Sequence, residues 1–214
     1  MTGAPSGPDR SDRGQAYTLE GITAGFLLLL ATLFALQAVI LTPITVGSVD
    51  EGSQSRLRSE ASDILQVTAN RQTEDLTYHA LYWSPLDRTF SGADSPRIGY
   101  GTEGPPGKFG RFLEESFDTR GRNYNVILRY RQNNSTSSAV QRMTFQGQPS
   151  RSAVVASYTI TLFDDMRLTG PARSTTTIGE MDTNATDNDD GYFYAPDVAD
   201  GPVYNVIEVR LIVW

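Results

Sequence analysis

Two short stretches of the sequence contain residue types that could bind a ligand. Residues 99–104 match the G-x-G-x-x-G pattern of dinucleotide sites. That pattern requires a strand before it and a helix after it, whereas Pro96 precedes it here and Pro105-Pro106 follows, so we predict a plain loop. Residues 182–193, DTNATDNDDGYF, resemble half of a calcium loop, but Val198 stands where the closing glutamate would fall. We expect a solvated acidic loop there and no metal site.

The side chains that most enzymes use for catalysis are scarce. His79 is the only histidine and there is no cysteine, so histidine metal clusters and most Ser/His or Cys/His nucleophile arrangements cannot be built. We expect His79 on a helix surface or in packing. The carboxylates of Glu114-Glu115 and Asp164-Asp165 are sequence neighbours, which point in different directions on a helix or strand. The sequence therefore predicts no catalytic residue, no cofactor and no small-molecule substrate, with a metal hydrolase built on the acidic loop as a remote alternative.

The charge balance of the 214-residue chain argues against nucleic acid as a partner. The net charge is −7, and Lys108 is the only lysine among 18 basic residues. Nucleic-acid binding depends on neutralising phosphates, and no basic stripe stands out in the sequence. An acidic composition rich in arginine fits a salt-adapted protein, and a GC-rich genome explains the arginine bias equally well.

Three N-x-S/T triplets are candidate glycosylation sites, at Asn133, Asn134 and Asn184. All three lie in polar stretches typical of turns. Their positions favour surface loops on an external domain.

A long apolar run dominates the N-terminal part of the chain. Residues 22–41 contain no charge, and a helix of twenty residues spans roughly 30 Å, the thickness of the hydrocarbon core of a bilayer. The run is longer than the core of a signal peptide and lacks a good cut site after it. We predict a transmembrane helix over 15–43, inserted in the cell membrane as a single pass with a cytoplasmic N-terminus and the bulk of the chain external.

The rest of the chain is predicted to be one α+β domain over 44–214. Residues 1–14 are polar and rich in Pro and Gly, typical of a disordered leader or cytoplasmic tail. A stalk helix is expected over about 48–71, with Leu57, Ala61, Ile64, Leu65 and Thr68 on one face. A short second helix is expected within 72–90, stopped by Ser84-Pro85. A further helix is expected around Phe109, Phe112, Leu113 and Phe117, ended by Gly121. Four alternating segments predict an antiparallel sheet of about four strands packed on these helices: 123–131, 141–147, 154–163 and 203–214.

The segment RGQAYTLEG and the apolar run that follows it resemble the start of archaeal type IV pilin-like proteins. The same N-terminal residues and the ending GPVYNVIEVRLIVW look like a group of haloarchaeal membrane proteins of unassigned function. The resemblance implies a leader cut by a type IV prepilin peptidase at Gly14 and Gln15, and retained helices that assemble into a filament. It also implies that Glu20 meets the free amino terminus during assembly. The alternative is that Glu20 is a favourable charge in the first turn of a helix capped by Thr18.

These features lead to two hypotheses about function. The first is a pilin-like, single-span membrane protein with a structural or assembly role in a type IV pilus-like or secretion filament, with the bilayer and other pilin-like subunits as partners. Small residues such as Gly21, Ala24 and Gly25 permit close helix packing and favour association. The second is a membrane-tethered external binding or accessory module that does not polymerise.

Overall fold

A computed structural model of the chain describes residues 10–40, 48–132, 137–171, 177–181, 193–198 and 201–214. The chain divides into two compact units, Met1–Val49 and Asp50–Trp214. The candidate glycosylation residues Asn133, Asn134 and Asn184, and the acidic loop before Phe193, lie outside the described residues.

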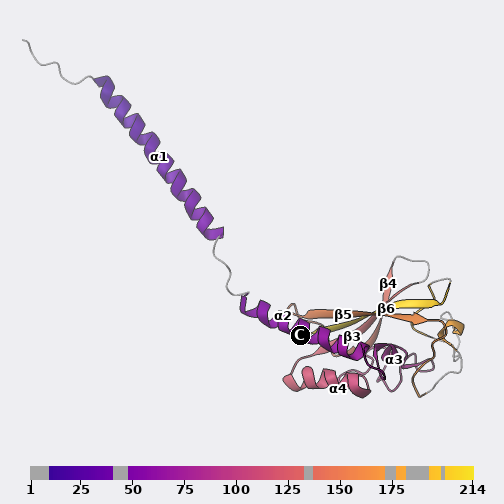
Figure 1. Cartoon of the computed structure of the whole chain (residues 1–214). Helices are drawn as coiled ribbons and strands as arrows, with labels where there is room; N and C mark the ends of the chain where they lie inside the picture. The colour runs from indigo at the N-terminus through magenta and orange to yellow at the C-terminus, as the bar shows by residue number, and fades with distance from the viewer. Residues whose placement is uncertain (1–9, 41–47, 133–136, 172–176, 182–192, 199–200) are drawn as a thin grey trace, which may run out of the picture. The chain divides into compact units, whose positions relative to one another are not determined.

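The first unit contains one long helix, α1 (Arg10–Ile40) (Figure 1). Among the described residues, none of the helices combines the length and the apolar content that crossing a bilayer requires. The predicted transmembrane helix over 15–43, and with it the single-pass membrane localisation, is therefore wrong. The apolar run does not form an element of its own, because the helix begins in the polar segment and includes four charged residues: Arg10, Asp12, Arg13 and Glu20.

The second unit contains three α-helices in its described part. Helix α2 (Ser48–Ala69) begins at the boundary of the unit, α3 (Leu76–Ala80) is a short helix capped by the side chain of Asp75, and α4 (Gly107–Ser116) follows two prolines. A short 3-10 helix, η1 (Asp118–Arg120), ends at Gly121, whose backbone is left-handed with a φ of 67°. Gly121 thus ends the helical segment around Phe112, as the sequence predicts.

The main sheet of this unit has four antiparallel strands in the order β4-β3-β6-β5. Their bounds are β3 (Tyr124–Arg131), β4 (Ser138–Phe145), β5 (Val154–Phe163) and β6 (Val203–Val213). Central strands β3 and β6 pair in the register Val126 with Leu211 and Leu128 with Val209. The sequence predicts one sheet, but a second is present, a hairpin of β1 (Trp83–Ser84) and β2 (Thr89–Phe90).

One face of the main sheet is buried in the core of the unit. Alternate residues of β3 and β6, from Tyr124 to Leu128 and from Ile207 to Val213, are almost completely buried and belong to one core cluster with side chains of α2, α3 and α4. The five α2 residues predicted to share a face are all buried, which confirms that prediction. Helices α3 and α4 lie below the strands in Figure 1.

The opposite face of the sheet carries half-buried and exposed side chains. We call it the open face and define it by the outward residues of the four strands: Ile127, Arg129, Arg131, Val140, Arg142, Val155, Ser157, Thr159, Thr161, Phe163, Val206, Glu208, Arg210 and Ile212. An antiparallel sheet commonly has one face in the core and one face toward solvent, so this alternation is what the strand sequences dictate.

Candidate interaction surfaces

The described part of α1 exposes apolar side chains around its whole circumference. Nine large hydrophobic residues between Tyr17 and Leu33 are 48% to 76% exposed. Four of them are consecutive: Leu27, Leu28, Leu29 and Leu30. Successive residues of a helix point about 100° apart, so these four side chains together surround the helix. The hydroxyl groups of Thr23 and Thr32 donate back to the carbonyls of Leu19 and Leu28, at 2.6 and 2.9 Å. The helix therefore presents an apolar surface with no polar stripe along it.

Glu20 and two glycines mark one end of this apolar surface. Glu20 is exposed, and among the described residues no partner of its carboxylate is recorded. Gly21 and Gly25 follow four residues apart, and a Cβ atom built on either would meet nothing within 4 Å. Gly14 and Gln15, the residues expected at a processing site, lie within α1. The structure thus places the predicted processing and assembly residues on a single helix.

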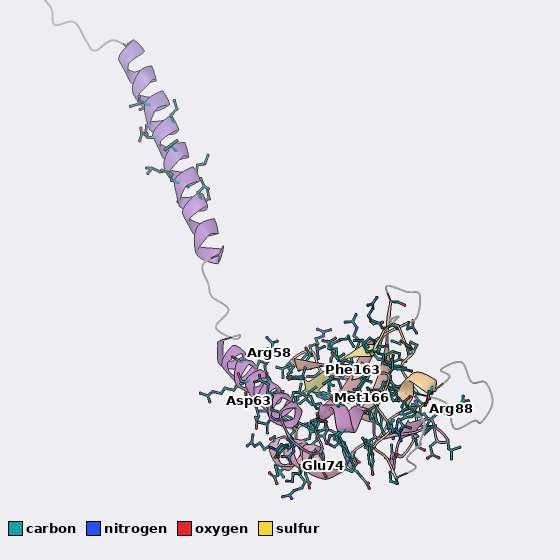
Figure 2. All side chains as sticks on the ribbon, turned by 45° about the vertical axis from the view of Figure 1, so that its right-hand side comes forward. Arg58, Asp63, Glu74, Arg88, Phe163 and Met166 are labelled. Carbon is teal, nitrogen blue, oxygen red and sulfur yellow. The ribbon has the colours of Figure 1, made fainter. Side chains whose placement is uncertain are left out.

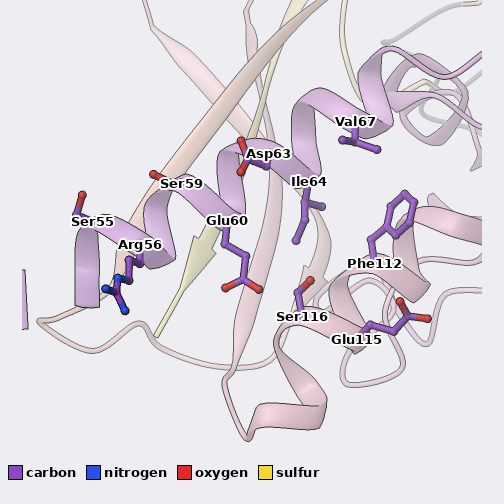
Figure 3. Close-up of a pocket in the computed structure, with 10 residues that line it drawn as sticks. All are labelled: Ser55, Arg56, Ser59, Glu60, Asp63, Ile64, Val67, Phe112, Glu115 and Ser116. Atoms are coloured by element: carbon purple, nitrogen blue, oxygen red, sulfur yellow. The ribbon is translucent and has the colours of Figure 1, made fainter. Parts of the chain in front are cut away.

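A surface groove lies between α2 and α4 in the second unit (Figure 3). Its volume is about 520 Å³. The apolar part of the lining is Ile64, Val67 and Phe112, and the side chains around it are polar or charged: Ser55, Arg56, Ser59, Glu60, Asp63, Glu115 and Ser116. Figure 3 shows Glu60 reaching toward Ser116 across the groove, whereas Phe112 and Val67 lie at its other end. Such a groove could hold the apolar face of a helix with basic residues at its margins.

Ion pairs hold two of the groove's carboxylates. Nη1 of Arg120 lies 2.6 Å from Oε1 of Glu60, and Nη2 of Arg111 lies 3.6 Å from Oε1 of Glu115. The guanidinium of Arg71 also stands over the Phe112 ring, 6.0 Å from its centre. The groove therefore combines three apolar side chains with charged margins, and two of its carboxylates are held in ion pairs.

A second hollow lies at the end of β5, lined by Phe163, Asp164, Asp165, Met166 and Pro202, with a volume of about 560 Å³. Figure 2 shows Phe163 and Met166 close together, and the Phe163 amide lies 3.5 Å from the Met166 sulfur. Burial, together with the carboxylates of Asp197 and Asp165, raises the pKa of Asp164. Within the described part of the chain, no group of three or more His, Asp or Glu side chains is arranged to hold a metal ion.

His79 is a packing residue on α3. Its side chain is buried, its ring centre lies 5.4 Å from that of Phe109, and its Nε2 has no hydrogen-bond partner among the described residues. Burial lowers the pKa of His79 to about 4, although the carboxylates of Glu74 and Asp75 act in the opposite direction. The ring is therefore neutral at pH 7 and belongs to the core.

The glycine-rich stretch over 99–104 forms a loop, which confirms the prediction. Gly99 has a φ of +62°, and a Cβ atom there would collide with the carbonyl oxygen of Met143 on β4. The next residue, Tyr100, donates its amide proton to that same oxygen at 2.9 Å. Gly99 is therefore needed for close approach to β4, and no strand leads directly into the glycines as a dinucleotide site would require.

The sequence did not reveal the groove or the open face. Both depend on contacts between segments far apart in the chain, such as Glu60 with Arg120. The signals that were present are the spacing of Ser55, Ser59 and Asp63 beside the apolar face of α2, and the arginines that alternate with apolar residues in β3 and β4.

Comparison with known proteins gives one match. A family model matches residues 13–213, which is nearly the whole chain, and its description is a family of unknown function, DUF7288. The chain belongs to this family. No curated protein and no solved structure matches it. The description of DUF7288 names no activity.

Proposed function

We propose that the chain is a non-enzymatic structural subunit that assembles with other copies of itself through α1. A pilin-like role in a type IV pilus-like or secretion filament, with other pilin-like subunits as partners, is the specific form of this proposal. The observation that carries it is the apolar surface of residues 17–33, which surrounds the helix.

The energetics support association between several copies. Burying one large aliphatic side chain contributes about 1.5 to 3 kcal/mol, so covering nine of them is worth on the order of 10 kcal/mol even when burial is incomplete. A helix face that meets one neighbour is about 100° wide. Because the apolar surface of α1 is not confined to one face, a single partner helix would leave most of it uncovered. A bundle of α1 helices from several copies covers it on all sides.

The glycines support close packing in such a bundle. Gly21 and Gly25 repeat at a four-residue spacing and have open space where a side chain would stand. Small residues at this spacing let two helix backbones approach closely. In this arrangement Glu20, one residue before Gly21, is the candidate assembly residue, because a carboxylate at the end of a helix bundle requires a cationic partner.

The test of this proposal is sedimentation of the full chain over a range of concentrations. We expect the natural chain and Leu28→Met to sediment as assemblies, because methionine keeps the apolar surface. Leu28→Glu should weaken association by more than about tenfold, because the contact would bury an unpaired charge. Tryptophan fluorescence serves as the folding control, since Trp83 and Trp214 both lie in the second unit. A chain that is monomeric throughout, or a Leu28→Glu chain that assembles like Leu28→Met, overturns the proposal.

The groove between α2 and α4 favours a second candidate, a binding module that does not polymerise. Its apolar lining and charged margins suit an amphipathic helix of a partner protein. This candidate predicts a monomeric full chain that binds a basic amphipathic peptide, with binding lost in Val67→Asp and kept in the nearby surface variant Gln66→Glu. Peptide binding measured by fluorescence anisotropy separates the two candidates.

A further inference from the structure

The open face carries a cluster of four arginines: Arg129, Arg131, Arg142 and Arg210. The register places Ile127 between Arg142 and Arg210 in one row across the sheet. Among the residues that define the open face, Glu208 is the one acidic side chain. Four arginines against one glutamate leave an excess of three positive charges on this face, in a chain whose net charge is −7.

Contacts within the second unit hold the guanidinium groups of two of these arginines. Nε of Arg129 donates to Oγ of Ser138 at 2.6 Å. Nη1 of Arg142 donates to the carbonyl of Arg97 at 3.1 Å, and its guanidinium carbon stands 4.5 Å from the centre of the Phe145 ring. A long side chain that is held before binding loses less conformational freedom when a ligand arrives. These two guanidinium groups are therefore positioned in advance for an anion.

A carboxylate already lies within the arginine cluster. Oε2 of Glu208 is 3.7 Å from Nη1 of Arg129, and Oε1 of Glu208 is 3.9 Å from Nε of Arg210. Both distances are longer than a hydrogen bond, and Nε of Arg210 has no hydrogen-bond partner among the described residues. Each guanidinium has five N–H donors, so one carboxylate shared at these distances leaves donors for further acceptors. The cluster thus accommodates a carboxylate and has the capacity for more.

We propose that the open face binds an acidic segment of a partner polypeptide, with the carboxylates of that segment over Arg129, Arg131 and Arg142. The planar guanidinium suits carboxylates, because it makes two parallel hydrogen bonds to one carboxylate. Every second side chain of an extended chain is on the same side, about 6.8 Å apart, which is also the separation of Arg129 and Arg131 along β3. A segment in which Glu or Asp alternates with another residue therefore places successive carboxylates over successive arginines. The proposed contact does not depend on assembly through α1, because it concerns the second unit alone.

The other side chains of the open face favour a polypeptide over nucleic acid. Ile127 lies between two arginines and Val140, which is 53% exposed, pairs with Arg129, so both can contact aliphatic parts of a peptide. Proteins that bind single-stranded nucleic acid stack the bases on aromatic side chains. The one aromatic residue of the open face, Phe163, ends β5, at the opposite edge of the sheet from β4. The negative net charge of the chain also repels a long polyphosphate.

Fluorescence anisotropy of a labelled peptide tests the inference with the full chain. The probe is a peptide of about nine residues in which Glu alternates with Thr, long enough to follow one strand, and the control peptide has Gln in place of each Glu. At low salt the glutamate peptide should bind at least about tenfold more tightly than the glutamine peptide, and added salt should reduce the difference. Equal binding of the two peptides, or no binding of either at millimolar concentration, overturns the inference.

Two substitutions on the open face should change the affinity in opposite directions. Arg131→Gln removes a guanidinium and should weaken binding of the glutamate peptide by about threefold to tenfold. Glu208→Gln removes the competing carboxylate and should tighten that binding by about threefold. Loss of structure does not tighten binding, so the second variant separates recognition from folding. A Glu208→Gln chain that binds the glutamate peptide more weakly than the natural chain overturns the inference.

Arg111→Gln is the matched control for Arg131→Gln. It removes one positive charge from α4, where the Arg111 side chain is 72% exposed. Buried side chains of α4 belong to the core on the other face of the sheet. The affinity for the glutamate peptide should therefore stay within about twofold of that of the natural chain. If Arg111→Gln weakens binding as much as Arg131→Gln does, the peptide responds to the overall charge of the chain and the inference is overturned.

The same variants distinguish other anionic partners. A single-stranded oligonucleotide of about eight nucleotides and vesicles that contain an anionic phospholipid are compared with the glutamate peptide. We expect the peptide to bind most tightly. Binding of the oligonucleotide or the vesicles that is tighter than peptide binding and is weakened in Arg131→Gln would overturn the inference in favour of that partner. If the chains sediment as monomers and bind the glutamate peptide as expected, the proposed function fails and this inference stands.

Discussion

Nη1 of Arg120 donates a 2.6 Å hydrogen bond to Oε1 of Glu60, a residue 60 positions earlier in the chain. The pair joins α2 to the segment that follows α4. The two walls of the groove are thus held together by an ion pair as well as by the packing of Ile64 and Leu113 in the core.

This pair should stabilise the fold only slightly. The side chains of Arg120 and Glu60 are 58% and 34% exposed, and exposed ion pairs contribute about 0.2 to 1 kcal/mol. A double-mutant cycle with Glu60→Gln and Arg120→Gln, measured by urea unfolding, should give a coupling energy of about 0.5 kcal/mol that falls with added salt. The more exposed pair Arg111 and Glu115 is the control and should give a smaller coupling energy. A coupling energy above about 2 kcal/mol would contradict the exposed geometry.

His79 should make the second unit less stable in mild acid. Its pKa is lowered to about 4 in the folded chain, against an ordinary value of 6.5, so the unfolded chain binds a proton first as the pH falls. The stabilisation is complete above about pH 6.5 and is lost as the pH falls toward 4. Between pH 7 and pH 5 the free energy of unfolding should fall by about 2 kcal/mol.

The matching measurement is urea unfolding at several pH values, followed by the fluorescence of Trp83 and Trp214. His79→Gln cannot take up a proton in this range, so its stability should change much less between pH 7 and pH 5. An equal loss of stability in His79→Gln would assign the pH dependence to other groups.

Gly99→Ala should destabilise the second unit by on the order of 2 to 4 kcal/mol. The left-handed backbone costs a non-glycine residue about 1 to 2 kcal/mol, and the new Cβ would also collide with the Met143 carbonyl oxygen on β4. Gly92→Ala is a matched control, because Gly92 has a φ of +77° but open space around the Cβ position. Urea unfolding should therefore show a smaller decrease in the free energy of unfolding for Gly92→Ala than for Gly99→Ala. Equal decreases would mean that β4 moves away from the new Cβ without an energetic cost.

Gly25→Ile should weaken assembly through α1, and Gly25→Ala should not. A branched side chain at this position keeps two helix backbones apart, whereas a methyl group is tolerated and favours the helix by about 1 kcal/mol. Sedimentation of the full chain checks both variants, with helix content followed by circular dichroism. If Gly25→Ile assembled at the same concentration as the natural chain, Gly25 would face away from the helix contacts.

Much of the second unit could be predicted because its periodicity is local. Alternation in 154–163 and 203–214 predicts strands with Ile160 and Val209 on the buried side, and both are buried. The five-residue face of α2 follows from helical spacing in the same way. The sequence predicts a short helix within 72–90, but only Leu76–Ala80 is helical and the hairpin of β1 and β2 follows it. That hairpin could not be predicted, because two-residue strands leave no alternation to detect.

The wrong predictions concern features that depend on residues outside the stretch considered. The transmembrane prediction weighed the apolar run of 22–41 alone, whereas the helix that contains it begins at Arg10. Phe193 ends the stretch predicted as a solvated acidic loop, and Tyr194 and Ala195 follow it, yet all three are buried. Tyr194 donates from its hydroxyl to the carbonyl of Ala80, a contact across 114 positions that no local pattern indicates.

Among the described residues, the hydrophobic core of the second unit starts at Leu57 on α2. Under the proposed function, substitutions in α1 act on the assembly of copies, whereas substitutions in the core act on the folding of each copy. Natural selection can adjust these properties one at a time. Over evolutionary time the helix and the domain can therefore diverge at unequal rates, and a lineage could replace its α1 sequence without redesigning the rest of the protein.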